Sequence, residues 1–169
     1  MSRRRHIFVA SVAIAILLPG CGDDAKPKLE VEDIDDAVAA VVGVVGRQVK
    51  FYEINATPDL INLFAADGKG NALNFVWENG KLRDESEAAP ADGAAFDASK
   101  MSFTSDVYAN VSDALPDSIL RAFAVTADGP KDSVLYRVMI QSQRGGQFAV
   151  LVDPSGKILG SDPLTGPTS

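Results

Sequence analysis

Carboxylates are the only acid/base side chains that are plentiful in this chain of 169 residues, which has 23 Asp and Glu. A pair of carboxylates can catalyse glycoside hydrolysis when the two groups lie roughly 5–9.5 Å apart. Here the acids fall mostly within 23–36, within 84–97 and in predicted turns, where solvated acids are common. We therefore expect no catalytic residue, and an enzyme using carboxylates is the least favoured function considered below.

Histidine and cysteine, which often act as bases, nucleophiles or metal ligands, occur once each, as His6 and Cys21. Both lie in or beside a segment with the features of an export signal. If this signal is cleaved before Cys21, the mature chain has no histidine and no free thiol. Such a chain cannot form a Ser-His-Asp triad, a His or Cys metal site or an internal disulfide.

Two groups of acids, Asp23-Asp24 and Asp33-Asp35-Asp36, could offer oxygen ligands to Ca²⁺. The ligand spacing of an EF-hand is absent from both, so we expect a polar tether and the acidic first turn of a helix. Gly68-Lys69-Gly70 contains a lysine between glycines, but it joins two predicted strands, whereas phosphate loops lead from a strand into a helix. The sequence therefore predicts no metal and no cofactor.

The N-terminal segment has a basic start, Arg3-Arg4-Arg5, followed by an apolar run over Ile7–Leu18. A membrane-spanning helix needs roughly 20 apolar residues, so the run fits the hydrophobic part of a signal peptide instead. The residues Leu18-Pro19-Gly20-Cys21 resemble the bacterial lipobox, although Pro19 departs from its usual small residue. Arg4 and Arg5 also loosely resemble a twin-arginine signal, so both export routes stay open.

The lipobox resemblance implies a signal peptide over residues 1–20 and a lipidated cysteine with its tether over 21–32. Cys21 would carry a diacylglycerol thioether, and two acyl chains are enough for stable anchoring. The implied location is the outer leaflet of the bacterial cell membrane, or the outer membrane of a Gram-negative cell. Removing Arg3, Arg4 and Arg5 from the 16 basic residues leaves 13 against 23 acids, a side-chain balance of −10, which disfavours nucleic acid as a partner.

The remaining chain is predicted to contain two units of one helix followed by a β-meander. In the first unit, 33–83, apolar residues from Ile34 to Val45 recur at helical spacing, and strands are expected over 47–55, 60–66, 71–78 and 81–83. Asn79-Gly80 is typical of a two-residue hairpin turn. An acidic, alanine-rich linker or solvated loop is expected over 84–100.

The second unit, 101–162, is predicted to repeat this order before a tail over 163–169. Phe103, Val107 and Val111 mark a helical face that Pro116 ends, and strands are expected over 118–127, 134–141, 147–153 and 157–159. We expect an α+β fold of two αβββ(β) repeats, whose antiparallel sheet of six to eight strands has both helices packed on one face. Two separately packed modules are the alternative.

The end of the second unit resembles a PepSY domain, through the strand at Tyr136-Arg137-Val138 and the stretch from Val152-Asp153 to Gly156-Lys157-Ile158. The tandem order of elements is also similar to the fold of beta-lactamase inhibitory protein. These resemblances imply an exported, PepSY-like module for protein interaction or inhibition, with no catalytic residues to transfer.

The two faces of the predicted sheet differ in pattern. Ile61, Leu63 and Ala65, with Leu73, Phe75 and Trp77, are expected to face the helices, and Trp77 is expected to belong to the core. The alternate residues of the same strands, which point to the other face of the sheet, are also apolar in part. An exposed apolar face of this kind favours a binding surface. The candidate binding residues on it are Leu60, Asn62, Phe64, Leu135, Arg137 and Met139. Alternatively, residues 84–100 or a crossing helix cover this face.

The sequence thus predicts a lipid-anchored envelope lipoprotein that binds another envelope protein without catalysis, with inhibition of that partner as one form of the activity. The alternative is a carrier or sensor of a small apolar ligand or lipid. A carrier would need an enclosed cavity of roughly 300 Å³ or more between the sheet and the helices.

Overall fold

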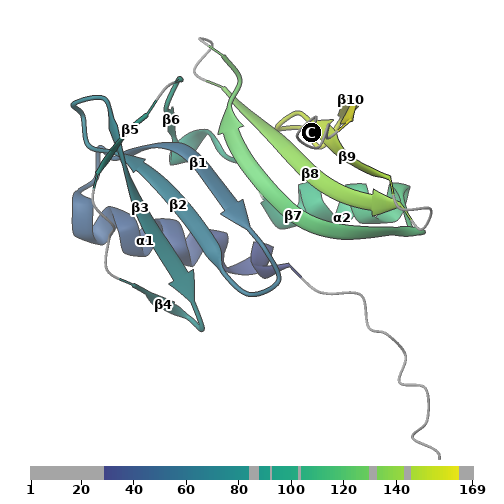
Figure 1. Ribbon diagram of the computed structural model, residues 1–169, viewed down its shortest axis with the longest axis horizontal. Helices are drawn as coiled ribbons and strands as arrows, with labels where there is room; N and C mark the ends of the chain where they lie inside the picture. Colours follow the sequence, from purple (N-terminus) through teal and green to yellow (C-terminus); the bar gives the residue numbers. More distant parts are fainter. Residues whose placement is uncertain are drawn as a thin grey trace, which may run out of the picture.

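The computed structural model describes residues 29–83, 88–91, 93–102, 104–129, 133–142 and 146–163. These residues form an α+β structure in which one open antiparallel sheet has two α-helices on one of its faces (Figure 1). The helical elements are η1 (Glu30–Asp33), α1 (Ile34–Val45), η2 (Ala98–Lys100) and α2 (Thr104–Ala114). The strands are β1 (Lys50–Ala56), β2 (Ile61–Ala66), β3 (Asn71–Glu78), β4 (Lys81–Leu82), β5 (Ala89–Pro90), β6 (Phe96–Asp97), β7 (Ser118–Ala127), β8 (Val134–Ser142), β9 (Gln147–Val152) and β10 (Ile158–Pro163).

The helix α1 forms because its apolar residues return to one face at helical spacing. Ile34, Ala37, Val38 and Val41 are all buried, and Asp35 and Asp36 lie in the first turn, where carboxylates favour the helix dipole. The helix ends at Gly46, whose φ of 122° suits a glycine and whose N–H donates to the Val42 carbonyl. The helical spacing predicted from Ile34 to Val45 matches α1, and the 3₁₀ turn η1 precedes it.

The sheet order is β10-β9-β8-β7-β1-β2-β3-β4, with β5 paired to β3 and β6 paired to β1. The pairing of β1 with β7, from Glu53 opposite Thr126 to Ala56 opposite Phe123, makes the sheet continuous across the chain. Separate modules are therefore not observed. The sheet has ten strands, more than the six to eight expected, because the segment 84–100 contributes β5 and β6.

Parts of the expected linker or solvated loop over 84–100 pair with the sheet, as β5 (Ala89–Pro90) and β6 (Phe96–Asp97). Phe96 is 1% exposed and packs in the core with its ring centroid 6.2 Å from that of Phe51. At the other end, Ala89 and Pro90 pair with Ala72 and Asn71 of β3, an edge position at which proline is tolerated. One large apolar side chain and one short edge pairing are thus enough to hold it against the sheet.

The Asn79-Gly80 turn prediction is supported by the backbone. Asn79 has a φ of 53° and Gly80 a φ of 71°, and a type I′ turn requires positive φ at both positions. This turn returns the chain from β3 into the short strand β4.

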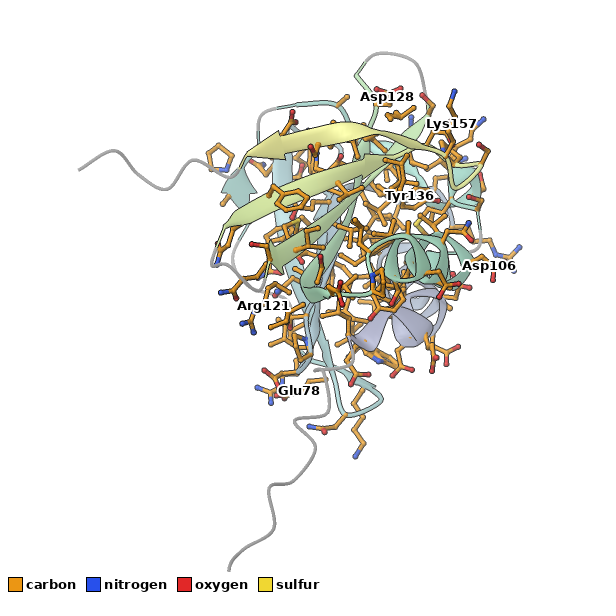
Figure 2. All side chains as sticks on the ribbon, turned by 90° about the vertical axis from the view of Figure 1, so that its right-hand side faces the viewer. Glu78, Asp106, Arg121, Asp128, Tyr136 and Lys157 are labelled. Carbon is orange, nitrogen blue, oxygen red and sulfur yellow. The ribbon has the colours of Figure 1, made fainter. Side chains whose placement is uncertain are left out.

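The two faces of the sheet differ as the alternation predicts. Ile61, Leu63, Ala65, Phe75 and their counterparts Tyr136, Val138, Ile140, Val150 and Val152 are buried on the helix side. Trp77 is half-buried against this core, and its indole Nε1–H donates to Asp33 Oδ2 at 3.3 Å. Figure 2 shows Tyr136 between the sheet and α2. The main core therefore lies between the sheet and the helices, and the opposite sheet face is left for other contacts.

Candidate interaction surface

We call the sheet face opposite the helices the open face, and strand register places its residues in cross-strand rows. One row runs Asn74, Phe64, Glu53, Thr126, Leu135 across β3, β2, β1, β7 and β8. The next row runs Val76, Asn62, Asn55, Ala124, Arg137, Leu151. The apolar members Phe64, Val76, Leu135 and Leu151 are only half-buried, so the open face keeps accessible apolar surface.

Five of the six candidate binding residues belong to this face. Phe64 and Leu135 share the first row, Asn62 and Arg137 share the second, and Met139 lies on the same side between Ala122 and Ala149. The structure therefore brings residues of both predicted units onto one surface.

The sixth candidate, Leu60, lies in the turn just before β2, one residue outside the strand. The Thr57 hydroxyl oxygen accepts hydrogen bonds from the N–H groups of Asp59 and Leu60, and the Leu60 carbonyl accepts from Thr57 N at 2.9 Å. This local network of a threonine with the backbone competes with strand pairing. The β2 strand accordingly begins one residue later, at Ile61.

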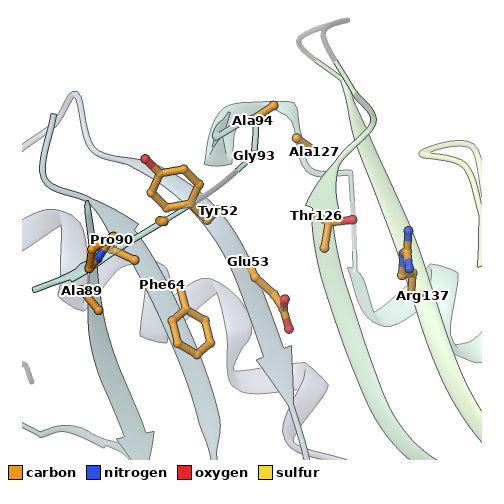
Figure 3. A pocket seen from close by; sticks show the side chains of 12 residues that line it. Tyr52, Glu53, Phe64, Ala89, Pro90, Gly93, Ala94, Thr126, Ala127 and Arg137 are labelled. Carbon is orange, nitrogen blue, oxygen red and sulfur yellow. The ribbon is translucent and has the colours of Figure 1, made fainter. Parts of the chain in front are cut away.

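A groove of about 590 Å³ hollows the open face (Figure 3). It lies where β1 changes its partner from β6, at Lys50 and Phe51, to β7, from Glu53 onward. Tyr52, Phe64 and Pro90 line its apolar side, and Glu53, Thr126 and Arg137 line its polar side. Ala89, Ala91, Gly93 and Ala94 also line it, so the described residues of the segment 84–100 form one wall of the groove and cover the open face only in part.

A β-bulge explains why Tyr52 and Glu53 both reach this groove. The register of β1 against β2 shifts between Phe51 and Glu53, so two consecutive side chains fall on the same face. Sequence reasoning missed both residues because it assumed strict alternation. The signal was present, since the buried residues Phe51, Ile54 and Ala56 are spaced by three and then by two.

The groove contains two opposite charges that are not paired with each other. Within the described part of the chain, neither the Glu53 carboxylate nor the Arg137 guanidinium takes part in an ion pair. Strand β7 lies between their strands, and Figure 3 shows the two side chains on either side of Thr126. The neighbouring Arg121 differs, because its Nε donates to Gln141 Oε1 at 2.8 Å.

Two amides next to the groove carry buried oxygens with no partner among the described residues. They are Asn55 Oδ1 in β1 and Asn74 Oδ1 in β3. A buried acceptor without a hydrogen bond costs about 1–3 kcal/mol. Residues that cost stability at an otherwise well-packed surface are common at binding sites.

Three aspartates with lowered pKa values lie outside this groove, Asp67 and Asp153 in turns and Asp97 at the end of β6, where it caps η2. Hydrogen bonds from the side chain and backbone of Asn71 hold the pKa of Asp67 below its ordinary value, and those from Ser155 do the same to the pKa of Asp153. The Ser99 backbone N–H lowers the pKa of Asp97 in the same way. All three carboxylates accept from N–H groups of their own turn, which is a structural role.

Metal binding and binding of a small apolar ligand each require a particular site in the structure. Within the described ranges, no group of three or more His, Cys, Asp or Glu side chains is arranged to hold a metal ion. Besides the groove, a cavity of about 410 Å³ lies at Gly46, Arg47 and Asp67, where α1 ends, and one of about 390 Å³ lies between η1 and α2, at Leu29, Val31 and Tyr108. Neither matches an enclosed cavity between the sheet and the helices.

The lipidation residue Cys21, the lipobox residues Leu18, Pro19 and Gly20, and the rest of the signal lie outside the described residues. Among the residues that are described, no helix has the length and apolar character needed to span a membrane. No protein-family model, curated protein or solved structure matches the chain. The open face and its groove are the features of the described residues that suit the binding of a partner.

Proposed function

We propose that this protein is an exported, lipid-anchored lipoprotein of the bacterial envelope that binds another envelope protein through its open face, without catalysis. The observation that carries this proposal is the groove of about 590 Å³ on the sheet face that the helices leave uncovered. Its half-buried aromatic residues Tyr52 and Phe64 supply apolar contact area, and aromatic residues are enriched at protein interfaces. Inhibition of the partner is one outcome that such binding can have.

Lipid anchoring is supported by the order of the basic start, the apolar run over Ile7–Leu18 and Cys21. Replacement Cys21→Ser is expected to block processing at residue 21, so that the protein keeps its signal and lacks the acyl mass. Mass spectrometry of the membrane fraction measures both. Unchanged mass and unchanged membrane association in this variant would contradict the anchor.

We also propose that the chain arose by duplication of a PepSY-like unit. The strand order places β7 and β1 at the centre, with β8, β9 and β10 on one side and β2, β3 and β4 on the other. Each half follows one α-helix in the sequence. This arrangement supports two related units, and it puts the groove beside the line at which they meet.

Binding through the open face is tested with Phe64→Asp and Met139→Asp, which place a carboxylate on an apolar part of that face. Both side chains are half-buried, so we expect the fold to persist and the affinity for the partner to fall by at least tenfold, because burying an unpaired charge is costly. The matched control is Ala39→Asp on the exposed side of α1. Affinity-purification from envelope extract should recover the partner with the control and lose it with the two variants. Recovery with all three would refute the proposal.

A further inference from the structure

The groove presents three kinds of chemistry on successive strands. Phe64 of β2, with Tyr52 and Pro90 near it, is apolar; Glu53 of β1 is anionic; Arg137 of β8 is cationic. Register fixes this order, because Phe64 lies opposite Glu53, Glu53 opposite Thr126, and the neighbour of Thr126 along β7, Ala124, opposite Arg137. A ligand lying across the strands would meet the three parts in that sequence.

The two charges call for complementary charges from a ligand. In the described part of the molecule neither Glu53 nor Arg137 has an ion-pair partner, and Glu53 is half-buried. A partly desolvated carboxylate gains more from a cation than an exposed one does. Opposite charges that match across an interface also select the correct partner and its orientation.

The spacing of the two charges limits what can pair with both. Strands in a sheet lie about 4.8 Å apart, so the strands of Glu53 and Arg137, separated by β7, are about 10 Å apart. Arg137 is paired with Ala124, two residues along β7 from Thr126, so it is also offset from Glu53 by about 6.6 Å along the strands, and the two positions lie about 12 Å apart. An extended polypeptide advances about 3.3 Å per residue and points alternate side chains to opposite faces, so residues four apart, about 13 Å, present both side chains to the groove. A phosphoethanolamine headgroup carries its two charges only two carbon atoms apart, which is too short.

We infer that the groove binds an extended segment of the partner protein that carries a basic side chain over Glu53, an acidic side chain four residues away over Arg137, and an apolar side chain on the Phe64 side of the basic one. This inference rests on the proposed function, since it assumes that the open face binds protein. Beyond the proposed function, the inference states in which direction the partner segment runs across the strands. The charges of Glu53 and Arg137 determine that direction.

Selection from a random peptide library displayed on phage, against the full chain in detergent, tests the inference. Peptides selected on the natural protein should carry Lys or Arg four residues from Asp or Glu, with an apolar residue beyond the basic one. The double reversal Glu53→Lys with Arg137→Glu should weaken those peptides by roughly tenfold or more and select the opposite charge order. The reversal Asp36→Lys with Lys81→Glu, at exposed sites on α1 and β4, is the matched control and should change neither.

The outcomes separate this inference from the proposed function. If Phe64→Asp abolishes binding of the selected peptides and the double reversal leaves their binding unchanged, the charge pairing is overturned. The proposed function would then still stand. Peptides insensitive to both variants, or no selected peptide, would overturn the inference. Binding of phosphatidylethanolamine vesicles in place of peptides, lost in the double reversal, would overturn it in favour of a lipid headgroup. If the double reversal fails to fold by circular dichroism, Glu53→Gln with Arg137→Gln replaces it, and selected peptides should then lose their charge preference.

Discussion

At the scale of single residues, two asparagines near the groove, Asn55 and Asn74, carry buried amide oxygens without a hydrogen-bond partner among the described residues, which lowers the stability of the fold. Asn55 lies in the central strand β1, opposite Asn62 and Ala124, and its Oδ1 has no partner among the described residues. Valine has a higher strand propensity than asparagine, and an apolar side chain removes the unsatisfied acceptor. The proposed binding role of the open face would give a reason for an asparagine at this position.

The first prediction is that Asn55→Val raises the free energy of unfolding by about 1 kcal/mol. Urea unfolding measures this change, and Asn62→Val on the adjacent strand is the control, with a smaller expected gain because its amide is not left with a buried unpaired oxygen. The same Asn55 variant should bind the partner more weakly. A loss of stability would contradict this interpretation of the amide.

The second prediction concerns acid. The pKa of Asp153 is lowered in the folded state, chiefly by the Ser155 hydroxyl, which donates to its Oδ1 at 2.6 Å. A carboxyl whose folded pKa lies below its unfolded value, about 3.9, stabilises the fold above that pH, and the contribution is lost as the pH falls through the folded pKa. The melting temperature should thus lose this contribution below about pH 4. In Asp153→Asn the acid-side fall should be shallower than in the natural protein. Identical acid profiles for the natural protein and Asp153→Asn would exclude this role.

At the scale of elements, the sequence predicted most strands correctly, and its errors have physical causes. The strand over Ser118–Ala127 and the one over Asn71–Glu78 have the predicted bounds, because alternation and flanking turn residues are clear there. The bulge in β1 was missed because it breaks the alternation on which the prediction depended. The strands β5 and β6 were missed because each has two residues, too few for a pattern, and because pairing with distant strands creates them.

The elements of the C-terminal half are held together by a few specific contacts. The Ser102 backbone N–H donates to the Tyr136 hydroxyl at 2.9 Å, and the Ser102 hydroxyl donates to the Pro154 carbonyl at 2.5 Å. These bonds join the start of α2 to β8 and to the turn between β9 and β10. Asn110 of α2 also lies against that turn, within 2.6 Å of where a Cβ on Gly156 would be.

The third prediction compares two glycines. Gly156 has a φ of +83°, so Gly156→Ala strains the backbone and displaces the Asn110 side chain, with an expected loss of about 1–2 kcal/mol in unfolding free energy. Gly43 lies in α1 with nothing near its Cβ direction, so Gly43→Ala should gain about 0.5–1 kcal/mol. Chemical denaturation of both variants checks the pair. A stabilising Gly156→Ala would show that the turn does not adopt this conformation.

At the scale of the whole molecule, charge is distributed unevenly between the two layers. The segments 29–46 and 104–117, which contain η1, α1 and α2, hold eight acidic residues and no Lys or Arg. These residues are Glu30, Glu32, Asp33, Asp35, Asp36, Asp106, Asp113 and Asp117. The open face instead combines apolar residues with one acid and one base in the groove. If the open face binds a partner as proposed, we expect local chemistry in the groove, and not the overall negative charge, to select it.

The overall architecture and the position of the interaction surface followed from the sequence only in part. The alternation of side chains along the strands was enough to indicate a second, partly apolar face of the sheet. It also indicated five residues of that face, which are Asn62, Phe64, Leu135, Arg137 and Met139. The groove was not predictable, because it depends on the bulge at Tyr52, on the change of β1 partner and on the path of residues 89–94. These are long-range features, and no local pattern encodes them.

The most direct test of the central claim is site-specific photo-crosslinking in living cells that produce the protein. A photoreactive amino acid is placed at Phe64, at Met139 or, as a control, at Ala39 on the exposed side of α1. Our account predicts that positions 64 and 139 crosslink the same envelope protein, that position 39 does not, and that Glu53→Lys with Arg137→Glu abolishes the crosslink. A partner captured equally from position 39, or no protein captured from positions 64 and 139, would contradict binding through the open face.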